Sequence, residues 1–189
     1  VNHVINYLPE WNLYLDSTSD HTPFGMLPSG DRGKPVLHVE QYREGTQTPI
    51  PAMAGSTRID NQLKIHPDGS VSGSVEFFMQ GDVAVASRAA WRDLGPQEEE
   101  RWLKSALKQV GLNADGVIEK DDPAALSDQF RIKLVVKKAD KFLRLPGSGA
   151  FFIDPLWGAS PIGRMTFTPD SEAKPVPVAC STARVEENY

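Results

Sequence analysis

The stretch TRIDNQLKIHPDGSVSGSVEFFM, residues 57–79, decides the fold of most of this chain. In its first part, residues 57–66, Ile59, Leu63 and Ile65 fall on one side, and the positions between them are mainly charged or polar. A period of two is the pattern of a strand with one buried face. Residues 57–66 are therefore predicted to form such a strand.

A turn and a return strand follow directly. Residues 67–70 read Pro-Asp-Gly-Ser, and Gly69 adopts the positive φ of a tight turn at little cost. Residues 71–79 then place Val71, Val75, Phe77 and Met79 on one face. The two strands are predicted to pair as an antiparallel hairpin.

The pattern becomes helical after this hairpin. Asp82 is a candidate N-cap, and one side of the following helix carries Val83, Ala86, Ala90, Trp91 and Leu94. Gly95-Pro96 is predicted to end this helix and start another, which runs to Gly111. The expected buried stripe of the second helix is Trp102, Leu103, Ala106, Leu107 and Val110.

Strands are predicted again at residues 117–120 and 130–138, the second with Phe130, Ile132, Leu134 and Val136 on one face. Prolines interrupt the short apolar segments of residues 141–189 (142–143, 151–153, 165–167 and 176–178), which are expected to be edge strands or extended loops. The order of elements predicts an α+β fold, a mainly antiparallel sheet with two helices on one face.

Composition narrows the classes of function. The 189 residues are 40% hydrophobic and 8% aromatic, which suits one globular domain or a small pair. The net charge is −5 without a basic cluster, so no nucleic-acid partner is expected. No apolar run has the length of a membrane span, and the single Cys180 excludes a disulfide within the chain.

The amino-terminal stretch VNHVINYLPEWNLYLDST, residues 1–18, carries the candidate chemistry. Two short apolar runs flank residues 8–12, which predicts a second hairpin. Because side chains alternate along a strand, a loop of two or four residues puts His3 and Asp16 on the same face. An imidazole beside a carboxylate is the base and its orienting partner in a Cys-His-Asp or Ser-His-Asp site.

These residues resemble the bacterial transglutaminase-like family. The family pattern F-N-H-V-x-V-Y-x-P … L-Y-L-D-P-T is similar to residues 1–18, with Ser17 in place of the proline. A following pattern, P-F-G-x-L-P … D-R-G-K-P, is similar to residues 23–35. The resemblance implies His3 as the base and Asp16 as its partner, in a core whose nucleophilic Cys precedes both at the start of a helix.

The resemblance further implies that this chain is the carboxyl-terminal portion of a cysteine-type acyl-transfer or amide-hydrolysing protein, inactive alone. Residues 1–42 would be the end of the catalytic core, completed by a strand at 36–41. Residues 43–56 would be a linker, and 57–189 an accessory α+β domain. The expected partners are the upstream part of the same protein and a protein or peptide substrate, and the family suggests a periplasmic or exported location.

One other function, one other nucleophile and a metal site stand as alternatives to this interpretation. The chain could be a non-catalytic module that binds peptide or polysaccharide through its sheet edges. Cys180 follows His3 and Asp16 in the chain, opposite to the family order, and is interpreted as a structural thiol. A metal site from His3, Asp16, Asp20 and His21 matches no common zinc spacing, so no metal and no cofactor is predicted.

Overall fold

The computed structural model describes residues 3–39, 46–110, 112–139 and 183–189. Two helices and mostly antiparallel strands give the α+β fold that the sequence predicts. In chain order the elements are β1 (Asn6–Leu8), β2 (Leu13–Leu15), β3 (Gly55–Ile65), β4 (Val71–Gly81), α1 (Asp82–Arg92), α2 (Pro96–Gln109), β5 (Ala114–Lys120), β6 (Gln129–Ala139) and β7 (Ala183–Asn188). Short 3-10 turns lie at Pro9–Trp11 and Ser29–Asp31.

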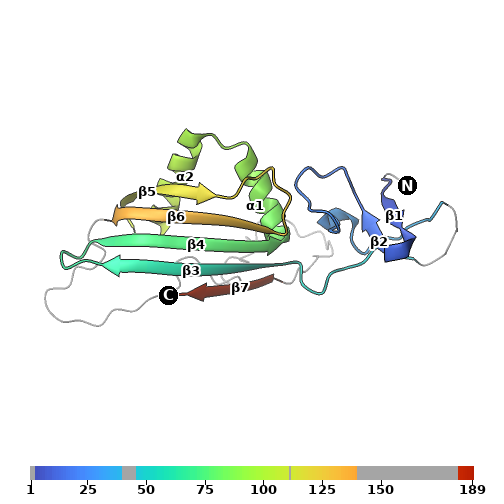
Figure 1. Cartoon of the computed structure of the whole chain (residues 1–189), viewed down its shortest axis with the longest axis horizontal. Coiled ribbons are helices and arrows are strands. Elements are labelled where there is room, and N and C mark those ends of the chain that lie inside the picture. Colours follow the sequence, from blue (N-terminus) through green and yellow to red (C-terminus); the bar gives the residue numbers. More distant parts are fainter. Residues whose placement is uncertain (1–2, 40–45, 111, 140–182) are drawn as a thin grey trace, which may run out of the picture.

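The larger sheet has five strands in the order β5-β6-β4-β3-β7 (Figure 1). Neighbours pair antiparallel except β3 and β7, which run parallel. The predicted β3–β4 hairpin is confirmed and is longer than expected, pairing Gly55 with Gly81 at its open end. At its turn Gly69 has φ 79°, the conformation for which glycine is suited.

The core lies between this sheet and the two helices. Val75, Leu134 and Leu107 are completely buried, from β4, β6 and α2 respectively. The predicted alternation of β6 is confirmed, since Phe130, Ile132, Leu134 and Val136 are all buried. Packing of one apolar sheet face against helices is the main source of stability in such a layer.

The prediction for α1 was wrong in two respects. Gly81 occupies the N-cap position, and Asp82 is the first helical residue, without a capping hydrogen bond to its own helix. The buried face carries Ala84, Arg88 and Trp91, whereas the expected Ala86 and Ala90 are exposed. Arg88 was not expected on a buried face, because an unpaired guanidinium is costly to remove from water.

The prediction for Trp102 in α2 was also wrong, since this residue is 40% exposed. Its ring packs edge-on against Trp91, with ring centroids 4.9 Å apart. The break between the helices is as predicted: α1 ends at Arg92, and α2 begins at Pro96 after the N-cap Gly95. Leu103 and Leu107 are buried as expected.

The strand expected at residues 36–41 is not formed in its described part, residues 36–39. Only an isolated bridge joins Pro35 to Gln47. A proline has no amide donor, which shortens any ladder at this point. Within the expected linker, the Thr48 amide donates to the Lys34 carbonyl, and β3 already begins at Gly55.

The carboxyl-terminal region is described only at residues 183–189. There β7 forms the edge of the sheet beside β3, a strand of mainly polar sequence that the apolar pattern did not single out. The four apolar segments of the tail and Cys180 lie outside the described residues. No helix in the described ranges combines the length and the apolar character that a membrane span requires.

The β1–β2 hairpin lies beyond the end of the large sheet, and the segment after it comes close to α1 (Figure 1). The strongest contact is that of Arg32 with Asp82 at the start of α1, where Nη1 donates to Oδ2 at 2.7 Å and Nη2 to Oδ1 at 2.6 Å. Arg88 of α1 also reaches the carbonyl of His21 at 3.5 Å. The amino-terminal segment is therefore held against the first helix of the sheet unit.

Candidate functional site

The β1–β2 hairpin positions the two predicted site residues. Tyr7 pairs with Tyr14 in the ladder, and the chain reverses through the 3-10 turn Pro9–Trp11. Asn12 has the left-handed φ of 48°, which asparagine tolerates better than most residues, and its side chain accepts a hydrogen bond from the Tyr7 hydroxyl at 3.0 Å. The four-residue loop gives the parity that places His3 and Asp16 on one face.

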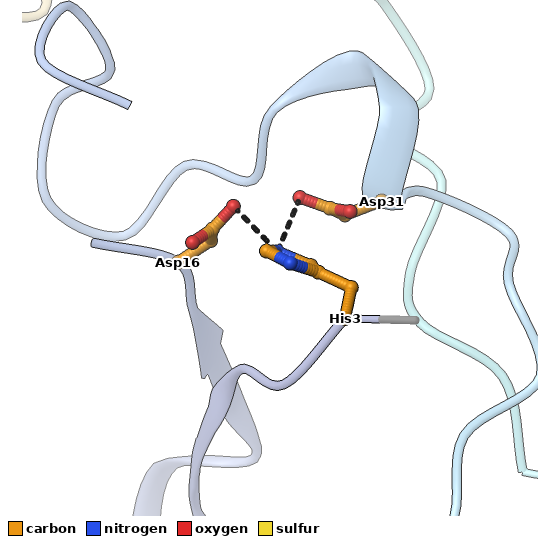
Figure 2. A group of neighbouring side chains, drawn as sticks. All are labelled: His3, Asp16 and Asp31. Carbon is orange, nitrogen blue, oxygen red and sulfur yellow. Dashed lines mark hydrogen bonds and ion pairs between the residues drawn. The ribbon is translucent and has the colours of Figure 1, made fainter. Parts of the chain in front are cut away.

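His3 and Asp16 are in direct contact, as the sequence predicts. The imidazole Nε2 lies 3.1 Å from Asp16 Oδ2 (Figure 2). The Asp16 side chain is only 3% exposed, whereas the His3 side chain is 39% exposed. A buried carboxylate thus holds a ring that remains accessible from the other side.

Asp16 is fixed by its neighbour Thr18. The Thr18 amide donates to Oδ1 at 2.9 Å, and the Thr18 hydroxyl donates to Oδ2 at 2.9 Å. Burial alone would raise the pKa of Asp16, but these hydrogen bonds and the one from His3 lower it to about 2. An ionised carboxylate only accepts hydrogen bonds, so in neutral His3 the proton is on Nε2.

This arrangement leaves Nδ1 of His3 as the basic atom. Within residues that the structure describes, no hydrogen bond to Nδ1 occurs, and no thiol is among them. An imidazole whose second nitrogen is held by a carboxylate can accept a proton at the first one. The described residues therefore place an imidazole against a buried carboxylate, and they include no thiol.

Asp31 is a third member of the site that sequence reasoning missed. Its Oδ2 lies 3.8 Å from Nε2 of His3, and its side chain is 21% exposed (Figure 2). Burial and the neighbouring Asp16 carboxylate raise the pKa of Asp31, and the charges of His3 and Lys34 offset part of this. Asp31 falls within residues 23–35, whose similarity to the family pattern was the only signal for it in the sequence.

The same three side chains are the described group that could hold a metal ion. One donor atom from each of His3, Asp16 and Asp31 lies within 4.8 Å of the others. The alternative set with Asp20 and His21 is not assembled, since Asp20 instead faces Arg92 at 3.5 Å. Both oxygens of Asp16 already accept hydrogen bonds from Thr18, which a bound cation would have to share.

A small aromatic cluster joins Tyr7 and Tyr14 of the same hairpin to His38. The Tyr14 hydroxyl contacts His38 Nε2 at 3.0 Å, and the rings of Tyr7 and Tyr14 are 4.5 Å apart between centroids. Tyr7 and His38 also pack edge to face, with centroids 4.4 Å apart. His38, for which the sequence suggested no partner, thus stabilises the hairpin that carries His3 and Asp16.

Comparisons of the chain with protein-family models, with curated proteins and with solved structures find no match in any of the three.

Proposed function

We propose that this chain is the carboxyl-terminal portion of a transglutaminase-like protein that performs cysteine-type acyl transfer or amide hydrolysis. His3 acts as the base and Asp16 as its orienting partner, and the Cys nucleophile comes from the upstream part of the same protein. The observation that carries the proposal is the 3.1 Å contact between His3 Nε2 and the buried carboxylate Oδ2 of Asp16. The resemblance of residues 1–18 and 23–35 to the family patterns supports it.

The chemistry follows from which ring nitrogen is held. Asp16 occupies the Nε2 side, so the thiol must approach Nδ1, to which it gives its proton. The thiolate attacks the carbonyl carbon of an amide, forming a thioester as the carbon–nitrogen bond breaks. His3 returns its proton to the leaving amine. Water or a second amine then attacks the thioester carbon and gives its proton to Nδ1. The carbon–sulfur bond breaks, and His3 passes this proton to the leaving thiolate, which regenerates the thiol.

The exposed apolar side chains of the amino-terminal segment support the proposal that a preceding part of the same protein packs against it. Large apolar side chains that remain exposed between residues 3 and 53 are Val4, Trp11, Phe24, Leu37, Val39, Ile50 and Met53. A contiguous part of the same core would bury such side chains at a gain of about 25 cal/mol per Å². Their concentration in the segment that carries His3 and Asp16 is what a catalytic core shared with preceding residues requires.

The test uses the full-length gene product. A Cys at the start of a helix, roughly 30–60 residues before His3, is required by the proposal. With such a protein, His3→Ala should lower the rate of acyl transfer from an activated amide by about 10²–10⁴-fold, because the base is removed. His66→Ala is the matched control, since His66 lies at a turn of the sheet and contacts Ser72 at 2.8 Å.

Two results would contradict the proposal. One is the absence of any upstream Cys. The other is an equal loss of activity in His3→Ala and His66→Ala, which would indicate a general effect on folding. The alternative function, a binding module without catalysis, predicts that neither substitution changes the affinity for peptide or polysaccharide at the sheet edges.

A further inference from the structure

Asp31 approaches His3 on the same side as Asp16, and the proposed triad makes no use of it. In Figure 2 the imidazole of His3 lies between the two carboxylates. Nε2 is 3.1 Å from Asp16 Oδ2 and 3.8 Å from Asp31 Oδ2. The ring nitrogen opposite the attacking thiol therefore faces two carboxylates, and only that of Asp16 is within hydrogen-bond distance.

The backbone of Asp31 is fixed on both sides. Its amide donates to the Pro28 carbonyl at 3.0 Å within the 3-10 turn Ser29–Asp31. Its carbonyl accepts a hydrogen bond from the Thr48 hydroxyl at 2.5 Å. Thr48 is itself buried, and its amide donates to the Lys34 carbonyl at 2.9 Å. The fold thus fixes the backbone from which the Asp31 side chain reaches His3.

The next residue ties this segment to the sheet unit. The Arg32 guanidinium donates to the Leu27 carbonyl from Nε at 2.8 Å and Nη2 at 2.6 Å. It also forms the paired hydrogen bonds to both oxygens of Asp82, the first residue of α1. The Arg32 side chain is only 9% exposed, and two parallel bonds to one carboxylate fix its orientation. We call this contact the Arg32–Asp82 clamp.

The pKa values of the two carboxyl groups are shifted in opposite directions. Hydrogen bonds hold the pKa of Asp16 at about 2, whereas burial and the charge of Asp16 raise that of Asp31. The titratable and charged groups that face Asp31 are Asp16, His3 and Lys34. As the pH falls, Asp31 is therefore the member of the pair that accepts a proton first.

We propose that Asp31 is a positioning residue for His3, and that the Arg32–Asp82 clamp of the sheet unit holds it in place. The second carboxylate limits rotation of the ring and stabilises the imidazolium that forms when Nδ1 takes the thiol proton. This gives the sheet unit a role in the site, because its first helix supplies Asp82. The inference rests on the proposed function for its catalytic consequence, while the positioning itself is a property of this chain.

The first test is nitrogen NMR of the His3 ring in the 189-residue chain. In the unmodified chain, the neutral ring should carry its proton on Nε2. Asp31→Asn should raise the population with the proton on Nδ1, and Asp82→Asn should move the His3 signals in the same direction. Asp20→Asn is the matched control, because Asp20 also faces α1, through an exposed contact with Arg92. His3 signals that are unchanged in both Asp31→Asn and Asp82→Asn would overturn the proposal.

A second variant covers a failure to fold. Arg32→Lys keeps the charge but cannot bond both oxygens of Asp82, so it should shift the His3 signals less than Asp82→Asn. In the full-length protein, Asp31→Asn should lower kcat about 10–100-fold with KM unchanged, since a small misplacement of the base has that effect. If the NMR shifts occur and the full-length protein transfers no acyl group, the proposed function fails and the positioning stands. If acyl transfer occurs and Asp31→Asn changes neither readout, only the positioning fails.

Discussion

Arg88 is the most informative side chain to replace in the fold, because it is a cation with no exposed surface. Its Nη2 donates to the carbonyls of Ser127 and Gln129, the second at 3.0 Å. Its guanidinium carbon lies 5.8 Å from the centre of the Phe130 ring. Burial lowers the pKa of Arg88, and the charges of Asp128 and Asp121 offset part of this.

Replacement by methionine separates the hydrogen bonds from the packing. Arg88→Met keeps an apolar stem beside Phe130 and leaves the carbonyls of Ser127 and Gln129, and the more distant one of His21, without their charged donor. Each such bond is worth about 1.5–3 kcal/mol, and removal of the buried charge returns part of that sum. We therefore expect a loss of about 2–4 kcal/mol in the free energy of unfolding. Arg88→Ala should lose about 2 kcal/mol more, from the deletion of further buried groups at about 0.8 kcal/mol each.

Urea unfolding followed by tryptophan fluorescence measures both values, because the buried Trp91 lies on the same helix. At a slope of about 2 kcal/mol per M, Arg88→Met should lower the midpoint by about 1–2 M. Arg101→Met is the control, since Arg101 is an exposed residue of α2 that also donates to a carbonyl, that of Gln97 at 3.4 Å. A loss below about 0.5 kcal/mol for Arg88→Met would refute the reasoning that its hydrogen bonds to the Ser127 and Gln129 carbonyls stabilise the fold.

Three further predictions follow from the described contacts. Leu107→Ala should lower the free energy of unfolding by about 2–5 kcal/mol, because Leu107 is completely buried, and an unchanged urea midpoint would contradict the proposed core. Gly73→Ala should prevent folding or destabilise the sheet strongly, because an added Cβ would lie 2.0 Å from the Gln62 carbonyl oxygen at φ 145°; Gly30→Ala, which meets nothing within 4 Å, is the control in the same circular dichroism melt. Asp16 has a lowered pKa of about 2 in the folded chain, so its charge stabilises the fold above its ordinary value of 3.8, and this contribution is lost as the pH falls from there through about 2. In urea unfolding measured at several pH values, Asp16→Asn should remove this dependence of the free energy of unfolding on pH. If that free energy changes equally with pH in both proteins, another group causes the dependence.

The sequence was sufficient to predict structure where the contacts form between residues that are close along the chain. The strands of the β3–β4 hairpin could be predicted because their alternation and the turn at Gly69 act within neighbouring residues. The contact of His3 with Asp16 could be predicted for the same reason, since parity and loop length fix which side chains share a face.

Long-range contacts account for what could not be predicted. The buried face of α1 depends on carbonyls at Ser127 and Gln129, which only the folded chain brings to Arg88. Asp31 approaches His3 from a separate segment, and the partner of the neighbouring Arg32, Asp82, is 50 positions away in the sequence. No periodicity encodes a pairing of this kind, so the similarity of residues 23–35 to the family pattern did not predict that Asp31 lies beside His3.

The most direct test of the central claim is mass spectrometry of the full-length protein after reaction with an activated amide substrate. The proposal predicts one thioester adduct, on a cysteine upstream of residue 1, that disappears in His3→Ala and remains in His66→Ala. An adduct on Cys180 of the 189-residue chain that requires His3 would contradict it, because the nucleophile would then follow the base in the chain and this chain would be an enzyme by itself.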